Sequence, residues 1–196
     1  MTTANCHDIL GDGTISYDPE KKLLKLNGFK FVTEEMIQGI SVMQALGNIT
    51  IEVHGDNEIV TNYMGLVFTS GGNIVGDGTL KITSKSQALV VNGTSVTIEK
   101  GPKLIISGED SGIFGYLEYG GEIIFDAANV IVEKGGIVNL FEIVFEGCGV
   151  STPQGSEIIV SHDQQRDKDY KSVGLNGEVY KGRIVVDIAG GVEDTL

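Results

Sequence analysis

The amino-acid sequence predicts an all-β fold, a single-stranded parallel β-helix (β-solenoid) of about five coils of ~24 residues each. Three observations support this prediction. The 196-residue chain contains 28 Gly, 3 Pro and no Trp, and many turns with few helix-length segments are typical of β proteins. Short aliphatic strands recur at a nearly constant spacing. The recurring strands fall into three columns that keep register, which hairpins of an antiparallel sandwich would not need to do.

The first column of predicted strands begins each time with a small residue followed by aliphatic residues. Its members start at positions 39, 65, 88, 112 and 136, and are therefore 26, 23, 24 and 24 residues apart. They are Gly39–Val42, Gly65–Phe68, Ala88–Val91, Gly112–Phe114 and Gly136–Val138. One repeat of this length cannot bury its apolar face alone, so we expect stacked coils to share a continuous core.

Two further columns complete the coil. The second ends each time in a small polar or acidic residue and comprises Ile59–Thr61, Lys81–Thr83, Ile105–Ser107, Ile131–Glu133 and Ile159–Ser161. The third is looser and comprises Asn48–Ile51, Asn73–Val75, Ser95–Ile98, Glu122–Phe125 and Ile143–Phe145. Coils stacked at roughly 4.8 Å would pair every backbone group and align the aliphatic residues in interior ladders. We also expect Asn48 and Asn73 to stack as a short asparagine ladder.

Residues 1–38 are predicted to cover the first coil. The runs Ile15–Tyr17 and Lys22–Leu26 flank a proline-containing turn, which is typical of a β-hairpin. The segment Thr33–Gln38 is predicted to form one helical turn, capped by its threonine. Cover of this kind is expected because an open edge of a sheet would otherwise pair with another chain.

The regular coils are expected over residues 39–161, and residues 162–196 are expected to close the fold. The stretch 162–172 is the most polar part of the chain and predicts a long loop. The runs Gly177–Tyr180 and Gly182–Asp187 predict a closing pair of strands, and the end of the chain from Ala189 is expected to fray. The whole chain, residues 1–196, is therefore predicted to be one domain.

Charge and composition exclude some partners. The chain has 14 Lys and Arg against 27 Asp and Glu, a net charge of −13. This argues against nucleic acid and against simple docking to anionic lipid. No apolar run approaches the ~18 residues of a membrane span. His7, His54 and His162 have no metal-ligand spacing, so neither a metal nor another cofactor is expected. Cys6 and Cys148 could form one bridge or remain two thiols.

Several segments between about residues 11 and 161 carry a resemblance to a known group of proteins. They are Ile15–Asp18, Leu24–Gly28, Gly39–Val42, the run Asn48–Ile59 (Asn-Ile-Thr-Ile-Glu-Val-His-Gly-Asp-Asn-Glu-Ile) and Gly76–Thr83. In these segments the chain resembles secreted β-helix proteins of gut bacteria that are labelled uncharacterised or carbohydrate-binding-domain-containing. The resemblance implies a right-handed, pectin-lyase-like β-helix, a secreted or cell-surface location, and contact with polysaccharide or another glycan.

An enzyme that cleaves acidic polysaccharides is the alternative to a binding module. A lyase needs Ca²⁺ held by carboxylates and a strong base, and a hydrolase needs carboxylates about 5–10 Å apart. The only two arginines, Arg166 and Arg183, lie outside the expected coils. The only acidic pair inside the coils, Glu109-Asp110, lies at a turn, where Asp is expected for backbone reasons. The sequence favours a non-catalytic exported module and leaves an enzyme and a rigid adhesin segment open.

Aromatic and acidic residues of the coils are the candidate sugar contacts, because sugars bind exposed aromatic faces flanked by hydrogen-bonding groups. If Ile113 points inward, strand alternation points Phe114, Tyr116 and Glu118 outward. A tyrosine at a coil corner with its hydroxyl in water is the structural alternative. The candidates are Tyr63, Tyr116, Glu118, Tyr119, Glu109 and Asp110. Because the chain is acidic, a neutral glycan is expected rather than an anionic one, unless Ca²⁺ bridges the two.

The same alternation predicts an apolar stripe on the outer face of the first column. Its members are Ser41, Val67, Val90, Phe114 and Val138. Stacked apolar residues on an outer face are usually covered or used in binding. A terminal segment, a second copy of the chain and a ligand are the three occupants considered, and the first two are favoured.

Overall fold

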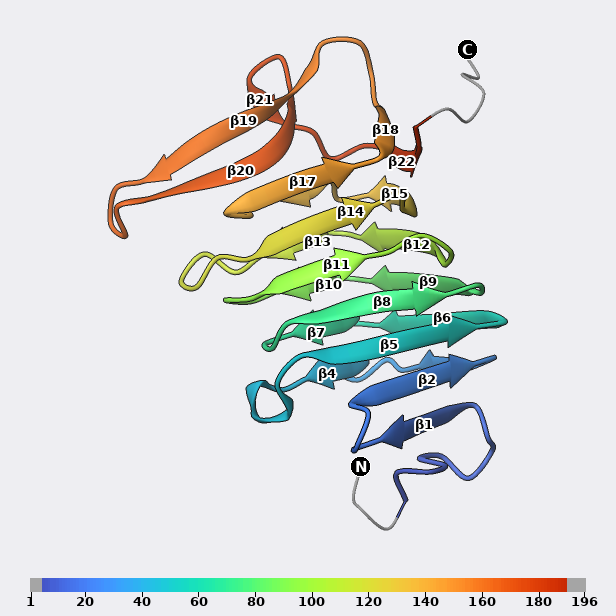
Figure 1. Cartoon of the computed structure of the whole chain (residues 1–196). Helices are drawn as coiled ribbons and strands as arrows, with labels where there is room; N and C mark the ends of the chain where they lie inside the picture. Colours follow the sequence, from blue (N-terminus) through green and yellow to red (C-terminus); the bar gives the residue numbers. More distant parts are fainter. Residues whose placement is uncertain (1–4, 190–196) are drawn as a thin grey trace.

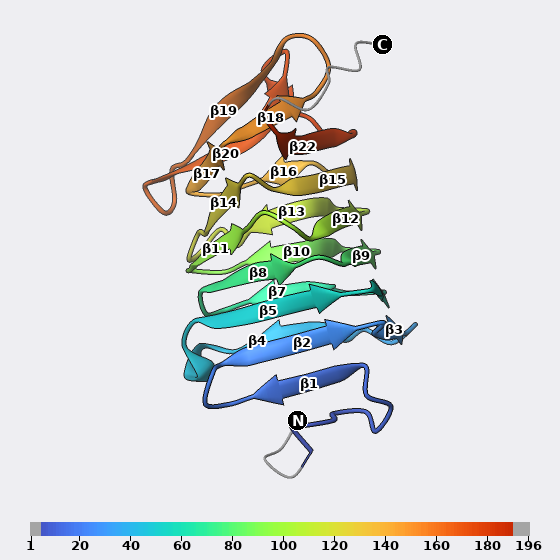
Figure 2. The ribbon, with the colours of Figure 1, turned by 45° about the vertical axis from the view of Figure 1, so that its right-hand side comes forward.

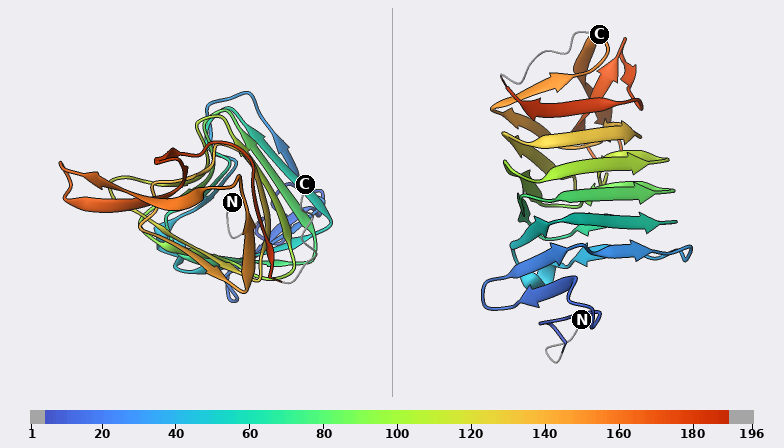
Figure 3. Two further views of the ribbon diagram at one scale, coloured as in Figure 1. Left: turned by 90° about the horizontal axis from the view of Figure 1, so that it is seen from above. Right: turned by 90° about the vertical axis from the view of Figure 1, so that its right-hand side faces the viewer.

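The structure is a computed structural model that describes residues 5–189. Its strands wind around a common axis as a three-sided β-solenoid (Figures 1 and 2). Viewed along the axis, the coils lie on top of one another (Figure 3). Within the described range the chain has no α-helix, and its one helical turn is the 3₁₀ segment η1 (Gln44–Leu46). The predicted fold class is confirmed.

Each side of the solenoid is one sheet, and each predicted column corresponds to one sheet. Sheet A contains the third column: β2 (Leu23–Asn27), β5 (Ile49–His54), β8 (Gly72–Gly76), β11 (Ser95–Ile98), β14 (Glu122–Asp126) and β17 (Glu142–Glu146). Sheet B contains the second column: β3 (Lys30–Val32), β6 (Asp56–Thr61), β9 (Thr79–Ser84), β12 (Lys103–Gly108) and β15 (Asn129–Lys134). Sheet C contains the first column: β4 (Ile40–Val42), β7 (Leu66–Phe68), β10 (Gln87–Val91), β13 (Ser111–Gly115) and β16 (Ile137–Val138).

All these strands pair in parallel with the strand one coil away. The chain visits sheets A, B and C in that order five times, from β2 to β16, and β17 begins a sixth turn within the described residues. The parallel pairs begin at β2 and β3, so the first coil starts before the expected position at residue 39.

The solenoid is right-handed. In Figure 1 the chain rises from the N-terminus to the C-terminus, the nearer strands of sheet A run from left to right, and the more distant strands of sheet B return from right to left. A chain that turns in this direction as it rises winds in the right-handed sense. The handedness that the resemblance implied is therefore found in the structure.

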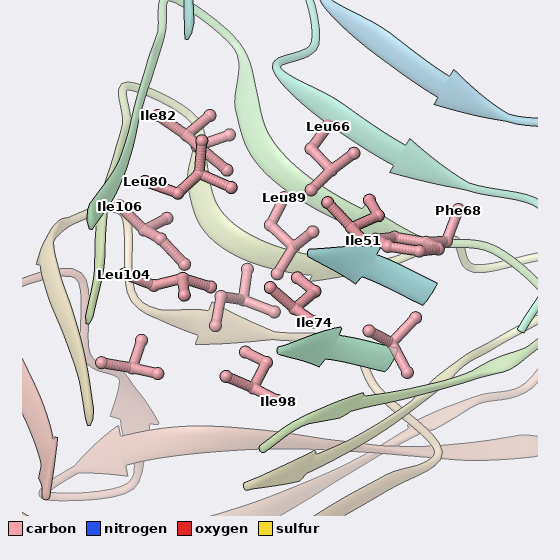
Figure 4. Packing of buried hydrophobic residues seen from close by; sticks show 14 of the residues in the cluster. Ile51, Leu66, Phe68, Ile74, Leu80, Ile82, Leu89, Ile98, Leu104 and Ile106 are labelled. Atoms are coloured by element: carbon pink, nitrogen blue, oxygen red, sulfur yellow. The ribbon is translucent and has the colours of Figure 1, made fainter. Parts of the chain in front are cut away.

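Ladders of aliphatic side chains fill the interior (Figure 4). Ile51 pairs with Ile74 and Ile74 with Ile98 along sheet A, and all three are fully buried. Sheet C contributes Leu66 and Leu89 in the same way. Burial of each such side chain stabilises the fold by about 1.5–3 kcal/mol. The apolar residues therefore hold the coils in register because a slip of one residue would turn every ladder outward.

One of the buried polar residues, Asn57, joins neighbouring coils, and the sequence did not single it out. Asn57 in β6 is 2% exposed and occupies the register position that Leu80 fills one coil later. Its side-chain oxygen accepts a hydrogen bond from the Phe29 N–H at 2.8 Å, and its amide donates to the His54 carbonyl at 2.8 Å. Asn57 thus ties the corner between sheets A and B across two coils. The expected Asn48–Asn73 ladder is wrong, because Asn73 pairs with Thr50 and Thr97.

Glycines allow the coils to approach closely at the next corners. Gly76 and Gly101 have φ values of +123° and +126°, which L side chains rarely adopt. A Cβ on Gly76 would overlap the Val53 carbonyl, and a Cβ on Gly101 would overlap the Gly76 carbonyl. The Gly-rich composition therefore reflects the stacked corners as well as the turns.

The N-terminal end is capped by a hairpin, as predicted. Strand β1 (Ile15–Asp18) pairs antiparallel with β2 and covers the edge of sheet A. The predicted helical turn at Thr33–Gln38 is wrong. Its backbone groups bond the next coil instead: the Glu34 carbonyl accepts a hydrogen bond from Asn62 at 2.5 Å, and the Gly39 N–H donates to the Met64 carbonyl at 3.0 Å. The segment connects β3 to β4 as an irregular loop with a bend at Glu35 and Met36.

The C-terminal end departs most from the prediction. The segment Ile159–Ser161 does not join sheet B, because it lies in β19 (Ser156–Asp163), which pairs antiparallel with β20 (Lys168–Leu175). The predicted long loop over 162–172 is therefore wrong. Both faces of this hairpin carry polar side chains. Its sequence therefore lacks the regular alternation of apolar and polar residues that predicts a half-buried strand. The hairpin leans out from the side of the solenoid (Figures 1 and 3).

Antiparallel strands close sheet B. Strand β22 (Ile184–Ile188) pairs with β15 on one side and with β18 (Cys148–Ser151) on the other. Strand β21 (Glu178–Val179) pairs with β20. The two predicted closing strands therefore exist, but they pair with other strands rather than with each other. Fraying was expected from Ala189, but the Ala189 N–H donates to the Gly147 carbonyl at 2.9 Å, and residues 190–196 lie outside the described residues.

Cys6 and Cys148 are not joined by a disulfide. Cys6 lies beside β1 at the N-terminal end, and Cys148 lies in β18 at the opposite end (Figure 1). Of the helical segments in the described residues, none has the length and apolar character required to cross a membrane.

Candidate ligand-binding site

The outer face of sheet C carries a second apolar cluster, separate from the core. Met64, Val67 and Val90 are buried there, and Tyr63 and Phe114 pack against them. Val67 and Val90 come from neighbouring strands at paired positions, as the predicted stripe requires. Tyr63, Met64 and Phe114 of this cluster form an apolar floor on the outside of the solenoid, and Val67 and Val90 lie buried behind them.

The loop after β13 forms one wall of the site. The Tyr116 ring meets the Phe114 ring edge to face, with centroids 6.0 Å apart and an interplanar angle of 80°. The loop turns back at once, since the Gly120 N–H donates to the Tyr116 carbonyl at 2.6 Å. Gly120 has a φ of +68°, and a Cβ there would overlap the Phe141 ring. The tight turn therefore fixes Tyr116, Leu117 and Glu118 beside the apolar floor.

The β19–β20 hairpin is anchored to this loop. The Tyr170 hydroxyl donates to the Leu117 carbonyl, and the Lys168 ammonium donates to the Glu118 carbonyl at 3.1 Å. Tyr170 also stacks on Phe141, with ring centroids 5.4 Å apart. These contacts hold the tip of the hairpin over the loop.

The floor, the loop and the hairpin tip border an open pocket of about 370 Å³. Its lining residues are Tyr63, Met64, Ser86, Gln87, Phe114, Tyr116, Leu117, Glu118 and Arg166. The volume lies at the low end of the roughly 300–1,000 Å³ typical of small-molecule sites. The lining combines aromatic side chains with a few polar groups, as such sites usually do.

Arg166 comes from the turn of the hairpin and is held by an ion pair. Its guanidinium Nη1 lies 2.6 Å from Asp163 Oδ2. This hydrogen bond holds the pKa of the Asp163 carboxyl below its ordinary value. The same bond raises the pKa of Arg166, with smaller contributions from Tyr170 and Glu118. Arg166 therefore stays charged at the mouth of the pocket.

The structure brings together half of the predicted sugar contacts. Tyr63, Tyr116 and Glu118 line the pocket. Tyr119 is exposed and lies against Gly93, outside the lining.

The acidic pair of the β12–β13 turn lies beside the pocket rather than in it. Glu109 and Asp110 are both exposed. Asp110 accepts a hydrogen bond at 2.9 Å from Ser86, which lines the pocket. Of the two acidic residues, Asp110 therefore contacts the pocket lining through Ser86.

Arg166 is the most informative residue that the sequence did not assign to the site. In the sequence Arg166 lies outside the expected coils, in a segment predicted to be a loop. Nothing in that segment indicated a binding residue. Only the hairpin pairing of β19 with β20 and the anchor at Tyr170 place Arg166 at the site. Its rarity was the available signal, since the chain has only two arginines.

The predicted stripe is covered by the chain itself. Val67, Val90 and Val138 are 3%, 1% and 6% exposed, and Phe114 is half-buried. Met64 and the pocket wall lie over the first two, whereas strand β16, which holds Val138, contacts β20. Ser41, the remaining member, is exposed. Met64, which packs against Val67 and Val90, belongs to the coils and not to a terminal segment, and self-association through the stripe stays a prediction.

Two histidines form ion pairs away from the pocket. His54 Nδ1 lies 2.6 Å from Asp77 Oδ1, and His162 Nδ1 lies 2.8 Å from Asp169 Oδ1. Each hydrogen bond raises the pKa of its imidazole. Among residues 5–189 there is no group of three or more His, Cys, Asp or Glu side chains placed to hold a metal ion.

Comparisons of the chain with protein-family models, with curated proteins and with solved structures return no match. Of the properties that the resemblance implied, the structure shows only the β-solenoid fold. The site must therefore be interpreted from its own geometry.

Proposed function

We propose that this chain is a non-catalytic, exported β-helix module that binds a glycan in the pocket on the outer face of sheet C. The observation that carries the proposal is the lining of that pocket. Aromatic and apolar side chains form its floor, and Ser86, Gln87, Glu118 and Arg166 supply polar groups around it.

This lining suits a sugar ring. The C–H groups of a pyranose face pack against aromatic rings, and its hydroxyls need nearby donors and acceptors. Tyr116 and Phe114 offer ring surface at right angles to each other. A tyrosine adds large contact area with few rotatable bonds, so its ordering costs little entropy.

The ion pair of Arg166 weighs against lyase chemistry at this pocket. A general base must lose its proton near the working pH. The pKa of Arg166 is raised above its ordinary value by Asp163, which makes deprotonation harder. The described pocket supplies Arg166 as a hydrogen-bond donor rather than a base.

Affinity gel electrophoresis against neutral and acidic polysaccharides, with and without Ca²⁺, tests the proposal. We expect one polymer to retard the wild-type chain and Tyr116→Ala to remove that retardation. Tyr119→Ala is the matched control, because Tyr119 is exposed three residues away and does not line the pocket. Its retardation should equal that of the wild type.

Each other outcome favours a different function. Retardation that fades as the polymer shortens during incubation would indicate a polysaccharide lyase or hydrolase. Retardation that both tyrosine variants lose equally would place binding elsewhere. No retardation by any polymer would contradict the glycan module and favour a rigid segment of a surface adhesin or scaffold.

A further inference from the structure

The pocket contains two ionised side chains of opposite sign. Glu118 projects from the loop after β13, and Arg166 comes from the turn between β19 and β20. They are close enough that Glu118 contributes to the raised pKa of Arg166. A ligand with a net charge of either sign would therefore meet a like charge in this pocket.

The cationic side chains near the pocket already have partners in the chain, so they do not form a site for an anionic sugar. The Arg166 guanidinium is already engaged by Asp163, and the Asp110 carboxylate accepts a hydrogen bond from Ser86 of the pocket lining. The Lys168 ammonium is occupied by the Glu118 carbonyl and lies 5.3 Å from the centroid of the Phe141 ring. An anionic sugar would thus gain one shared guanidinium and face the Glu118 carboxylate.

The two charged groups have complementary hydrogen-bonding roles. A carboxylate only accepts hydrogen bonds, and a guanidinium only donates them through five N–H groups. One guanidinium nitrogen bonds Asp163, which leaves other donors for a ligand. A hydroxyl group both donates and accepts, so it can satisfy Glu118 and Arg166 at once.

We infer that the pocket selects an uncharged sugar ring whose hydroxyls bridge Glu118 and Arg166 while the ring packs against Phe114 and Tyr116. This inference rests on the proposed function and names the ligand class of that same site. Glu118 and Arg166 are its specificity-determining residues. Two hydrogen bonds, Tyr170 to the Leu117 carbonyl and Lys168 to the Glu118 carbonyl, join the hairpin to the loop. They set the spacing of these two side chains.

Polymers that share a backbone and differ in charge test the inference. One set is hydroxyethyl cellulose, carboxymethyl cellulose and an aminated (cationic) hydroxyethyl cellulose, and the other is dextran, carboxymethyl dextran and diethylaminoethyl dextran. Retardation is measured for the wild type relative to Tyr116→Ala, so that adsorption outside the pocket cancels. We expect a neutral polymer to retard the wild type more strongly than its charged partners.

Variants then test the specificity pair directly. Glu118→Gln removes the carboxylate and keeps the shape, and we expect it to lose about tenfold in affinity for the neutral polymer. It should also bind the carboxymethyl polymer more tightly than the wild type does. Glu109→Gln is the control, because it makes the same change of net charge at an exposed turn outside the pocket lining. Thermal unfolding shows whether each variant is folded.

The outcomes separate the inference from the proposed function. Wild-type binding to a carboxymethyl or amino polymer that equals or exceeds neutral binding, and that Tyr116→Ala removes, would overturn the inference and leave the glycan module standing. Equal effects of Glu118→Gln and Glu109→Gln would also overturn it. No binding in either set would overturn both.

Discussion

The regular coils and the C-terminal hairpin differ in how their sequences specify structure. In the coils, a leucine such as Leu89 pairs with Leu66 below and Ile113 above, all inside the solenoid. In the hairpin, Val160 is 60% exposed and opposite Lys171. The coils supply a repeating scaffold, whereas the hairpin and the loop beneath it supply the residues that do not repeat. The pocket lies where these two parts meet.

The largest effect should come from breaking an interior ladder. Leu89→Ala removes a fully buried side chain between two neighbours and should lower the free energy of unfolding by about 2–5 kcal/mol. Val160→Ala in the hairpin should change it by less than about 0.5 kcal/mol. Urea unfolding followed by circular dichroism measures both. Similar losses would mean that the hairpin packs as tightly as the coils.

A buried polar corner should be next. Asn57→Ala leaves the Phe29 N–H and the His54 carbonyl without their partner inside the fold. We expect the free energy of unfolding to fall by about 1–3 kcal/mol. Asn73→Ala, which replaces an exposed asparagine in β8 of sheet A, is the control for the same measurement. An equal effect of the two substitutions would contradict the role assigned to Asn57.

Loosening the hairpin should affect binding more than stability. Tyr170→Phe removes the hydroxyl that donates to the Leu117 carbonyl, at a cost of about 1 kcal/mol in the free energy of unfolding. Because Arg166 depends on this anchor, retardation by the bound polymer should also weaken. Tyr17→Phe alters a buried tyrosine at the opposite end of the solenoid and should leave retardation unchanged. Unaltered retardation in Tyr170→Phe would show that the anchor does not position the site.

The smallest effect should be a pH dependence at an exposed corner of the coils. The hydrogen bond to Asp77 raises the pKa of His54. Its contribution to stability is therefore complete below the unfolded pKa of about 6.5 and is lost as the pH rises through the folded pKa.

A pair of variants measures this contribution. Asp77→Asn should reduce the fall in melting temperature between about pH 5.5 and 8.5 relative to the wild type. Asp126→Asn makes the same charge change at an exposed position in β14 and should preserve that fall. The same pH dependence in both variants would count against the His54–Asp77 pair.

The sequence predicted the coils well because packing repeats there. Ile40, Leu66, Leu89, Ile113 and Ile137 are direct neighbours in sheet C, at the spacings read from the chain. Tyr116 and Glu118, which strand alternation pointed outward, do line a pocket on the outer face, although the sequence predicted no pocket there. Periodicity carries this information because each coil repeats the environment of the last.

The features that the sequence did not predict depend on contacts that do not repeat from coil to coil. The hairpin β19–β20 has polar side chains on both faces, so no apolar alternation distinguishes its strands from a loop. Thr33–Gln38 has the residues of a helical start, yet its neighbours on the next coil offer better backbone partners. Arg166 reaches the pocket through Tyr170, a contact between segments 53 residues apart. Single-sequence patterns carry no signal for such contacts.

The two arginines allow the most direct test of the central claim that the hairpin completes a binding site on the solenoid. Arg166 lines the pocket, and Arg183 is exposed outside its lining. The dissociation constant of the bound neutral polymer, measured by isothermal titration calorimetry, should rise at least about tenfold in Arg166→Ala and stay unchanged in Arg183→Ala. Equal dissociation constants for both variants and the wild type would contradict the account.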